Sequence, residues 1–184
     1  MEHKGTMQLL TRRLILRPAR LSDAQAMYEN WAKDPEVTTF LTWQPHASAE
    51  VSRSILESWV DAYGRSDYYQ WMIVLKEGDE PIGSISVVSI NETVSSAEIG
   101  YCIGKHWWHQ GYTSEALGAV MDYLFDEVGV NRIEARHDVR NPNSGGVMRK
   151  CGMKFEGTHR QGARNNQGLC DVSVYAIVAE DRGK

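Results

Sequence analysis

The sequence predicts a mixed α/β fold, in which a mostly antiparallel central sheet is flanked by helices. Three strand-like segments follow one another closely, at residues 70–76, 81–90 and 95–104. A long apolar helical pattern over residues 113–128 then leads into a further strand-like segment at 132–139. Because helical patterns precede and follow these strands, a sheet with helical layers accounts best for the order of the elements.

The N-terminal part of the chain predicts one strand and a first helix. The apolar run Leu14–Arg17 indicates a short strand. Ser22 or Asp23 is suited to cap a helix that continues to about Lys33. The helix is expected to stop there, because a proline at position 35 disfavours the helical conformation of the residue before it.

A second helix is expected over residues 49–63. Apolar side chains recur there every four residues, and this spacing places them on one stripe of a helix. The pattern is therefore typical of an amphipathic helix with a single apolar face. The residues of this stripe are Val51, Ile55, Trp59 and Tyr63.

The centre of the chain predicts an antiparallel meander followed by a crossover helix. Polar turns at residues 77–79 and 91–93 join the three strands. The helix over 113–128 has one apolar face, and Gly129 is suited to end it. The strand at 132–139 alternates apolar and polar side chains. The helix between the third meander strand and this strand is the one clear crossover connection.

The remainder of the chain predicts a short helix after Pro142 and two final strands, near residues 155–160 and 169–178. No repeat, low-complexity block or linker interrupts the sequence. At 184 residues, with 42% hydrophobic and 24% charged residues, the chain is expected to form one domain over residues 1–184.

Composition and charge argue against several classes of protein. The formal net charge is −4 and the basic residues are dispersed, so no nucleic-acid partner is expected. No stretch approaches the roughly 20 apolar residues of a membrane-spanning helix, so no membrane association is expected. The three cysteines are an odd number without C-x-x-C spacing, which favours reduced thiols over a disulfide framework. We therefore expect a cytoplasmic protein.

The loop between residue 104 and the crossover helix is the first candidate for a binding site. Ligands of such sheets bind beyond the carboxyl end of a strand that feeds a helix. Free N–H groups at a helix start form an anion site, and Gly111 allows close approach to the main chain, so a pyrophosphate fits there. From spacing alone, an equally good interpretation is that Gly111 permits a turn and Thr113 or Ser114 caps the helix.

Four segments of the chain together carry a resemblance to a known family. They are TRRLILRPARLSDA, FLTWQPHAS, AEIGYCIGKHWWHQGYTSEAL and NPNSGGVMRKCGMKFEGTHR. They span nearly the whole chain, and they resemble, in the same order, segments of the GNAT superfamily of N-acetyltransferases, in particular its RimJ/RimL-like branch of ribosomal-protein N-terminal acetyltransferases. The resemblance implies the GNAT, or acyl-CoA N-acyltransferase, fold and transfer of an acetyl group from acetyl-CoA to a primary amine.

The resemblance implies a coenzyme site on the third meander strand and the loop after it. Main-chain amides of residues 109–114 would hold the pyrophosphate, and Asn141 would contact the pantetheine arm, although Asn before Pro is also a good helix N-cap. Arg149 and Lys150 would neutralise the adenosine phosphates, unless they are only solvated. The expected coenzyme-binding residues are Ile99, Tyr101, Ile103, His109, Gln110, Gly111, Tyr112, Thr113, Ser114, Asn141 and Arg149.

The chain departs from the family pattern at His109, where glycine is common, so we expect the loop to bend differently there. The histidine side chain would either reach the phosphates or the substrate entrance, or lie inert on the surface. His106 and His109 have a spacing compatible with metal binding, but no third ligand follows nearby and the superfamily is metal-free. No metal is therefore expected.

Two residues are candidates for proton transfer. An amine at neutral pH is mostly ammonium, so its proton must leave before attack, and a carboxylate near the acyl group is suited to take it. Glu98 precedes the loop and faces away from Ala97 and Ile99. The alternative is a solvated or salt-bridged strand residue. By resemblance, Ser144 would protonate or hydrogen-bond the leaving sulfur, because the helix tyrosine of many relatives is replaced here by Met148.

The acceptor side is expected to be lined by Phe40, Leu41 and Trp43, together with the loop at residues 162–168. For Trp43 a core position is the alternative. The most favoured acceptor is a protein N-terminal α-amine, attacked directly in a ternary complex. The other acceptors considered are a polyamine, an amino acid or an antibiotic amine. A catalytically silent acetyl-CoA-binding module is a further alternative, and a homodimer is possible.

Overall fold

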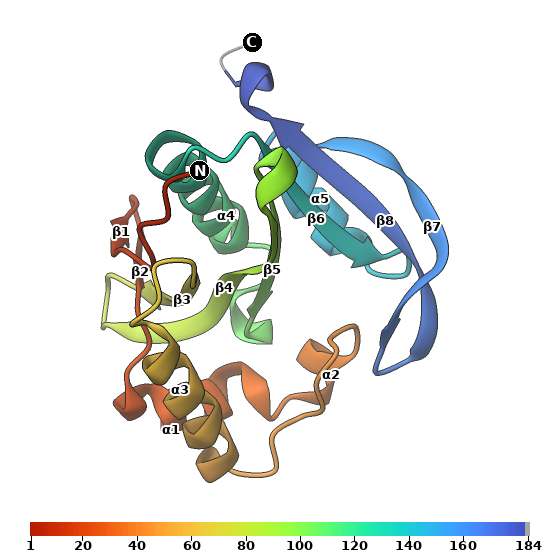
Figure 1. The fold of residues 1–184 in the computed structure, drawn as a ribbon. Helices are drawn as coiled ribbons and strands as arrows, with labels where there is room; N and C mark the ends of the chain where they lie inside the picture. The colour runs from red at the N-terminus through yellow and green to blue at the C-terminus, as the bar shows by residue number, and fades with distance from the viewer. Residues whose placement is uncertain (183–184) are drawn as a thin grey trace.

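A single sheet of eight strands lies at the centre of the computed structural model, which describes residues 1–182 (Figure 1). Its strand order is β1-β2-β3-β4-β5-β6-β8-β7. All neighbours are antiparallel except β5 and β6, so the expected mixed, mostly antiparallel sheet is confirmed. The strands are β1 Leu9–Leu10, β2 Leu14–Arg17, β3 Gln70–Leu75, β4 Glu80–Asn91, β5 Ser96–Ile103, β6 Arg132–Asp138, β7 Lys154–Asn165 and β8 Gly168–Val178.

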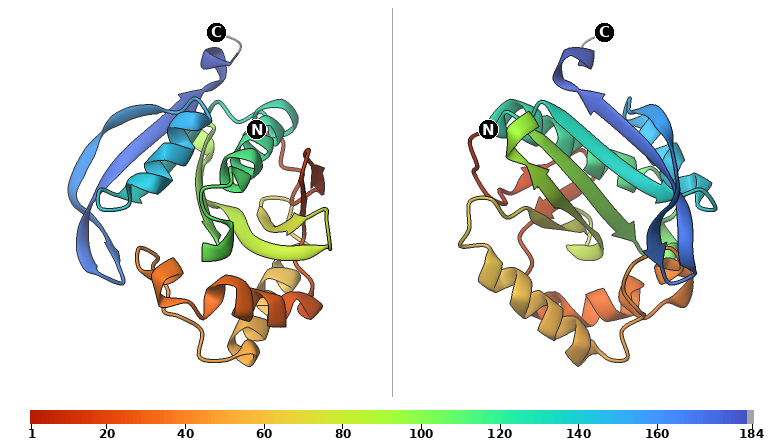
Figure 2. Two further views of the ribbon diagram at one scale, coloured as in Figure 1. Left: turned by 180° about the vertical axis from the view of Figure 1, so that it is seen from behind. Right: turned by 45° about the vertical axis from the view of Figure 1, so that its right-hand side comes forward.

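Helices cover both faces of the sheet. Figures 1 and 2 show α1 and α3 on one side, and α4 and α5 on the other. Across residues 1–182, no helix is long and apolar enough to cross a membrane. The helices are α1 Ala24–Met27, continued by a π-helical turn Tyr28–Ala32, α2 Pro35–Thr38, α3 Ala49–Ala62, α4 Tyr112–Tyr123, continued by a π-helical turn Leu124–Val128, and α5 Pro142–Lys150.

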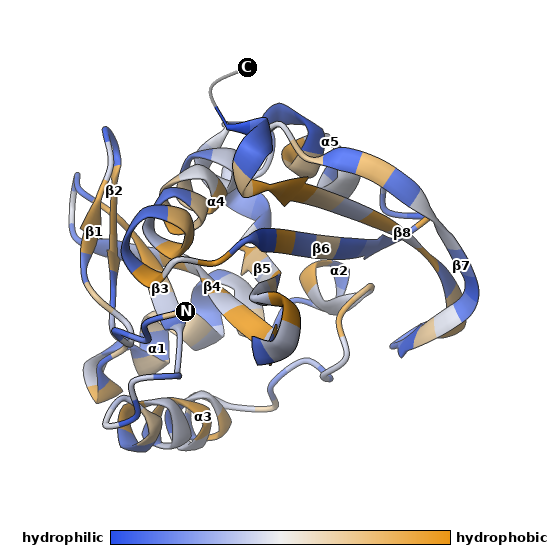
Figure 3. Ribbon diagram, turned by 45° about the horizontal axis from the view of Figure 1, so that its top comes forward, coloured by the Kyte–Doolittle hydropathy of each residue, from blue (hydrophilic) through white to orange (hydrophobic). Residues whose placement is uncertain are grey.

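Strand β3 separates two hydrophobic cores. Trp71 and Ile73 belong to the core under α4, and Met72 and Val74 belong to the core under α1 and α3. All four side chains are fully buried. A strand with both faces covered is expected to be continuously apolar rather than alternating, as this one is. Figure 3 shows the contrast with β6, whose exposed face is strongly polar.

A buried ion pair joins β2 to the short turn before α1. Arg17, on β2, donates two hydrogen bonds of 2.8 Å to the carboxylate of Asp23. Both residues are at most 5% exposed. Asp23 also accepts a hydrogen bond of 2.8 Å from the main chain of Arg20. This pair fixes the chain direction between β2 and α1.

The predicted apolar stripe of α3 is confirmed at Trp59 and Tyr63, which pack against the core under α1 and α3, and is wrong at Val51 and Ile55. Val51 and Ile55 are 40% and 37% exposed, whereas the buried residues are Ser52 and Leu56. A shift of one residue turns a helix face by about 100°. Leu56 belongs to the core under α1 and α3, and the hydroxyl of Ser52 is hydrogen-bonded to His46, so the polar side chain is tolerated there.

The C-terminal hairpin is longer than expected. Strand β7 continues to Asn165, so most of the segment 162–168, predicted as a loop, is strand, and Asn165 pairs with Gly168 across a two-residue turn. β7 is a polar edge strand with two register shifts, and its sequence therefore lacks a clean alternation. β1 and α2 were not predicted, because two and four residues are too short for a periodic signal.

Strands β5 and β6 pair only at their beginnings and then separate. No pair beyond Glu98 and Glu134 joins them in the described chain. On its other side β5 stays paired with β4, whose register shifts between Val87 and Ser89, opposite Glu98. Figure 1 shows the two strands diverging below this point. The main chain of the second half of β5 therefore faces a gap in the sheet.

Candidate active site

Helix α4 begins with main-chain amides that no side chain caps in the described structure. Gly111 occupies the N-cap with a φ of +80°, in the left-handed region that favours glycine. The hydroxyl of Ser114 donates to the carbonyl of Gly111 at 3.0 Å and does not accept from the amides. The capping alternative for Thr113 and Ser114 is therefore wrong, and the first amides are open to an anion.

Two tryptophans fix the loop that leads into α4. Trp107 is buried in the core under α4, and the indole of Trp108 donates to the carbonyl of Ile103 at 2.9 Å. Gly104 is required for this packing, because a Cβ atom there would lie 2.3 Å from the carbonyl oxygen of Asn30 and 2.7 Å from the Trp107 ring. These contacts fix the loop on its core side.

Two cationic side chains converge on this helix start. A Cβ atom at Gly111 would lie 3.3 Å from Nζ of Lys150 and 3.4 Å from Nη2 of Arg13. Arg13 is fixed there, since it donates to the carbonyl of Gln110 at 3.0 Å and to Glu115 at 2.7 Å. The site therefore combines open amides, a helix dipole and two positive charges, which together suit linked phosphates.

Glu115 anchors Arg13 as a carboxylate. Burial by itself raises the pKa of Glu115, but hydrogen bonds from Thr11 and from Arg13 outweigh it and hold the pKa below its ordinary value. Sequence reasoning missed Arg13, because it lies far from the loop along the chain and only the fold brings them together. No local pattern signals such a contact.

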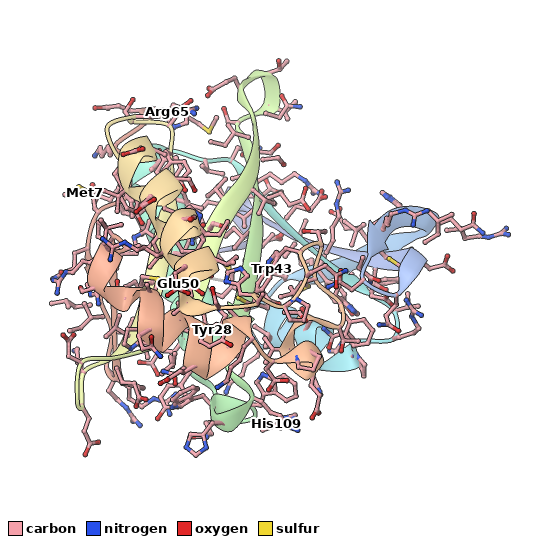
Figure 4. The ribbon with its side chains drawn as sticks, turned by 90° about the horizontal axis from the view of Figure 1, so that it is seen from below. Met7, Tyr28, Trp43, Glu50, Arg65 and His109 are labelled. Atoms are coloured by element: carbon pink, nitrogen blue, oxygen red, sulfur yellow. The ribbon has the colours of Figure 1, made fainter. Side chains whose placement is uncertain are left out.

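His109 has a φ of +60°, so the loop keeps the left-handed conformation that glycine takes easily. The histidine side chain is exposed, and Figure 4 places it at the edge of the molecule. Arg149 donates to the hydroxyl of Tyr175 at 2.9 Å, so it is Lys150 that reaches Gly111.

Beside the gap, Tyr101 of β5 reaches α5. Its hydroxyl donates to the carbonyl of Ser144 and is hydrogen-bonded to the Ser144 hydroxyl, both at 3.1 Å. Burial raises the pKa of Tyr101 well above its ordinary value, so the phenol stays protonated at any ordinary pH. Ile99 and Ile103 are buried on the same face of β5. The structure therefore brings Tyr101 and Ser144 together at the edge of the gap.

The other residues of α5 are placed as follows. Asn141 occupies the N-cap position, but within the described chain its side chain makes no capping hydrogen bond. Met148, which replaces the helix tyrosine of many relatives, is 1% exposed and belongs to the core under α4. Ser144 is thus the hydroxyl-bearing side chain that the first turn of α5 presents.

Glu98 lies at the last paired position before β5 and β6 separate, on the face opposite α4. Its side chain is 25% exposed. It accepts a hydrogen bond of 3.3 Å from Ser89, and the guanidinium of Arg136 is 3.6 Å away. Arg136 makes a closer bond, of 2.7 Å, to Glu134. Glu98 is therefore lightly held and accessible beside the gap.

The two segments expected to line the acceptor side are in contact. The side-chain amide of Asn166, at the tip of the β7–β8 hairpin, donates to the carbonyls of Thr38 and Trp43 at 2.8 and 2.7 Å. Figure 2 shows the hairpin tip beside α2. Trp43 also packs against the core under α1 and α3, and Phe40 lies 6.0 Å from the guanidinium carbon of Arg140.

A buried carboxylate stabilises the end of β6 near this wall. Asp138 accepts hydrogen bonds from Arg140, at 2.6 and 3.0 Å, and from Asn165 at 2.8 Å. The Arg140 guanidinium, with the Arg140 amide and Asn165, lowers the pKa of Asp138 far below its ordinary value, against the effect of burial. Asp138 therefore remains charged in the folded protein down to strongly acidic pH.

We expect Asp138→Asn to lower the free energy of unfolding at pH 7 by about 1–3 kcal/mol, because it weakens these hydrogen bonds. A lowered folded-state pKa gives stability that is complete above the unfolded pKa of about 4 and is lost as the pH falls below it. Chemical denaturation from pH 7 to pH 3 should show the two proteins converging. Asp67→Asn, in an exposed pair with Arg65, is the control. A constant difference below pH 4 contradicts the assignment.

Residues 13–154 match the family model of the acetyltransferase (GNAT) domain. The chain belongs to the GNAT family of acetyltransferases. This GNAT enzyme is 31% identical over 173 residues to the uncharacterized N-acetyltransferase p20 of Bacillus licheniformis, and the match covers 94% of this chain and 97% of that protein.

Two further similarities concern the branch of the family. The ribosomal-protein-serine acetyltransferase of Escherichia coli is 30% identical over 135 residues, covering 73% of this chain and 74% of that protein. The crystal structure of RimL, a ribosomal L7/L12 α-N-protein acetyltransferase in complex with coenzyme A, is similar with a TM-score of 0.81 and 25% identity, covering 94% of this chain and 98% of RimL. The GNAT fold and the RimJ/RimL-like resemblance are confirmed.

Proposed function

We propose that this GNAT enzyme transfers the acetyl group of acetyl-CoA to the α-amine of a protein N-terminus, by direct attack in a ternary complex in the cytoplasm. The observation that carries the proposal is the start of α4, where uncapped amides meet Lys150 and Arg13 beside the gap between β5 and β6. The ribosomal-protein acetyltransferases among the relatives support the choice of acceptor.

The residues present fit coenzyme A. The amides of residues 109–114, with Lys150 and Arg13, would hold the pyrophosphate, and Gly111 leaves room for its approach. From there the main chain of β5 beyond Glu98, unpaired on the side of β6, offers hydrogen bonds to the amides of a pantetheine arm. Bound in this way, the coenzyme supplies an activated acetyl thioester at the gap.

Proton transfer is assigned to residues on the two sides of the gap. Glu98, accessible on the face opposite α4, takes the proton of the acceptor ammonium, directly or through a water molecule. On the α5 side, Ser144 offers a hydroxyl to the leaving sulfur, and the hydroxyl of Tyr101 orients it. Much of the catalysis then comes from holding the two reactants together, since the attack of an amine on a thioester needs no covalent enzyme intermediate.

The acceptor is expected to enter along a wall formed by the loop that carries Phe40 and Trp43 and by the tip of the β7–β8 hairpin. The side-chain amide of Asn166 joins these two segments, because it donates to main-chain carbonyls of Thr38 and Trp43. A wall made of aromatic side chains and extended main chain suits a short peptide segment, which presents both backbone hydrogen-bonding groups and apolar side chains.

Release of free thiol from acetyl-CoA tests the proposal. We expect turnover with peptides that begin with Ser, Ala or Met, and none with the same peptides carrying a blocked N-terminus. Polyamines, amino acids and aminoglycosides form the comparison set. Turnover of a small amine with no reaction of any peptide would assign the enzyme to small-molecule acceptors. Coenzyme binding without turnover of any amine would indicate a silent binding module instead.

A further inference from the structure

His137, on β6, has a buried ring nitrogen that lacks a partner. Its Nδ1 lies 2.8 Å from the carbonyl oxygen of Asp138. A carbonyl only accepts, so Nδ1 carries the proton and Nε2 of the neutral ring holds a lone pair. Nε2 is buried, and nothing in the part of the chain that the structure describes donates to it. Buried polar atoms without a partner are uncommon in native proteins, and each requires an explanation.

The position of His137 in the sheet supplies an explanation for its unpartnered ring nitrogen. In the parallel register set by Glu98 and Glu134, residues 101 and 137 occupy matching positions, three residues beyond the last pair. Tyr101 reaches Ser144 from one side of the gap. From the other side His137 faces Gly145, where a Cβ atom would lie 2.6 Å from Nε2. The two side chains therefore approach the first turn of α5 from the two separated strands.

The His137 ring is held at one end only. The hydrogen bond from Nδ1 and a tilted contact with the Tyr175 ring, at 5.6 Å between centroids, orient it. Nε2 makes no hydrogen bond in the described structure, so no hydrogen bond fixes this end of the ring. Gly145 is required for this packing, because a Cβ atom there would collide with the His137 ring, and Gly146 likewise brings no side chain to this part of α5.

We propose that His137 is a positioning residue for the coenzyme, whose Nε2 accepts a hydrogen bond from a donor on the pantetheine arm. The inference rests on the proposed coenzyme site in the gap between β5 and β6. The donors on that arm are its amide N–H groups, its hydroxyl and, after acetyl transfer, the free thiol. No proton is transferred in this contact; it fixes the arm next to Tyr101 and Ser144.

Two substitutions of His137 test its two ring nitrogens independently. His137→Asn keeps an N–H near the position of Nδ1 and removes Nε2, whereas His137→Gln keeps a hydrogen-bonding group near Nε2. We expect calorimetry to show coenzyme A binding about 5- to 10-fold more weakly to the Asn variant, and within about twofold of wild type for the Gln variant. His159→Asn, an exposed histidine on β7, is the matched control and should bind like wild type.

Three ligands identify the donor: coenzyme A, acetyl-CoA and a coenzyme A analogue without sulfur. If the Asn variant loses affinity only for coenzyme A, the contact is with the thiol. If it loses affinity equally for all three ligands, the contact is with an amide or the hydroxyl. A second measurement needs no variant. The ¹⁵N resonance of His137 Nε2 in the wild-type protein should move toward a hydrogen-bonded acceptor when coenzyme A is added.

Unchanged affinity of the Asn variant, or an Nε2 resonance that does not respond to bound coenzyme, would overturn the inference and leave His137 a purely structural residue. That result leaves the proposed function intact. Failure of the wild-type protein itself to bind coenzyme A would be a different outcome, because it contradicts the proposed function and the inference together.

Discussion

Glu98→Gln is expected to lower kcat/KM at neutral pH by about 10²- to 10⁴-fold, the range typical of a lost general base. The amide keeps the shape of the side chain and its hydrogen bond from Ser89, but it cannot take a proton from the acceptor ammonium. The remaining activity should rise toward higher pH, where more of the amine is already neutral. Affinity for coenzyme A should not change, because Glu98 lies on the face opposite α4.

Steady-state rates between pH 6 and pH 10 measure this effect. Glu134→Gln is the matched control, since Glu134 lies on the same polar face and is hydrogen-bonded to Arg132 and Arg136. It should retain most of the activity. A Glu98→Gln enzyme with an unaltered pH profile, or an equal loss in the control, would remove Glu98 from the role of base and leave the salt-bridged strand residue as the better interpretation.

Asp23→Ala should have the largest effect on stability among single substitutions of charged residues, at about 3–5 kcal/mol. It leaves the guanidinium of Arg17 buried at 4% exposure without its counter-ion. It also removes the acceptor for the main-chain N–H of Arg20. Denaturant unfolding, monitored by far-UV circular dichroism, measures the change in the free energy of unfolding.

The double substitution Arg17→Met with Asp23→Leu distinguishes the buried charge from the loss of packing. Apolar replacement of a whole buried ion pair is often close to neutral, so much of the stability should return. The site lies elsewhere in the fold, and the double variant should keep its affinity for coenzyme A. If Asp23→Ala lowers the free energy of unfolding by less than about 1 kcal/mol, water reaches Arg17 and the charge is not buried as described.

Local and periodic patterns account for what the sequence predicted well. The continuous apolar run of β3 and the alternation of β6 placed these strands to within about a residue of the observed bounds. The helix start near Thr113 and the neighbouring Gly111 located the uncapped start of α4, because a glycine before an apolar helical pattern is a local signal. The crossover between β5 and β6 followed from the long helix between them.

Contacts between distant segments account for what was missed. Arg13 reaches Gly111 only in the folded chain, and no spacing within its segment indicates this. Lys150 was expected near the adenosine phosphates, and the structure places it at Gly111. In the first half of α3, Val51 and Ile55 were assigned to the wrong face, because several faces of that helix carry apolar residues and only packing against α1 selects one. His137 lay inside a correctly predicted strand, but its unpartnered nitrogen depends on how α5 packs over that strand.

The central claim is that linked phosphates of coenzyme A bind at the start of α4. A titration of the ¹⁵N-labelled protein with coenzyme A, followed through its backbone amide resonances, tests this most directly. With coenzyme A, we predict the largest resonance shifts at residues 109–114 and smaller shifts along the second half of β5. With pantetheine, which lacks the pyrophosphate, the shifts at residues 109–114 should be much smaller. Saturable shifts confined to other parts of the molecule, with the amides of residues 109–114 unmoved, would contradict the account.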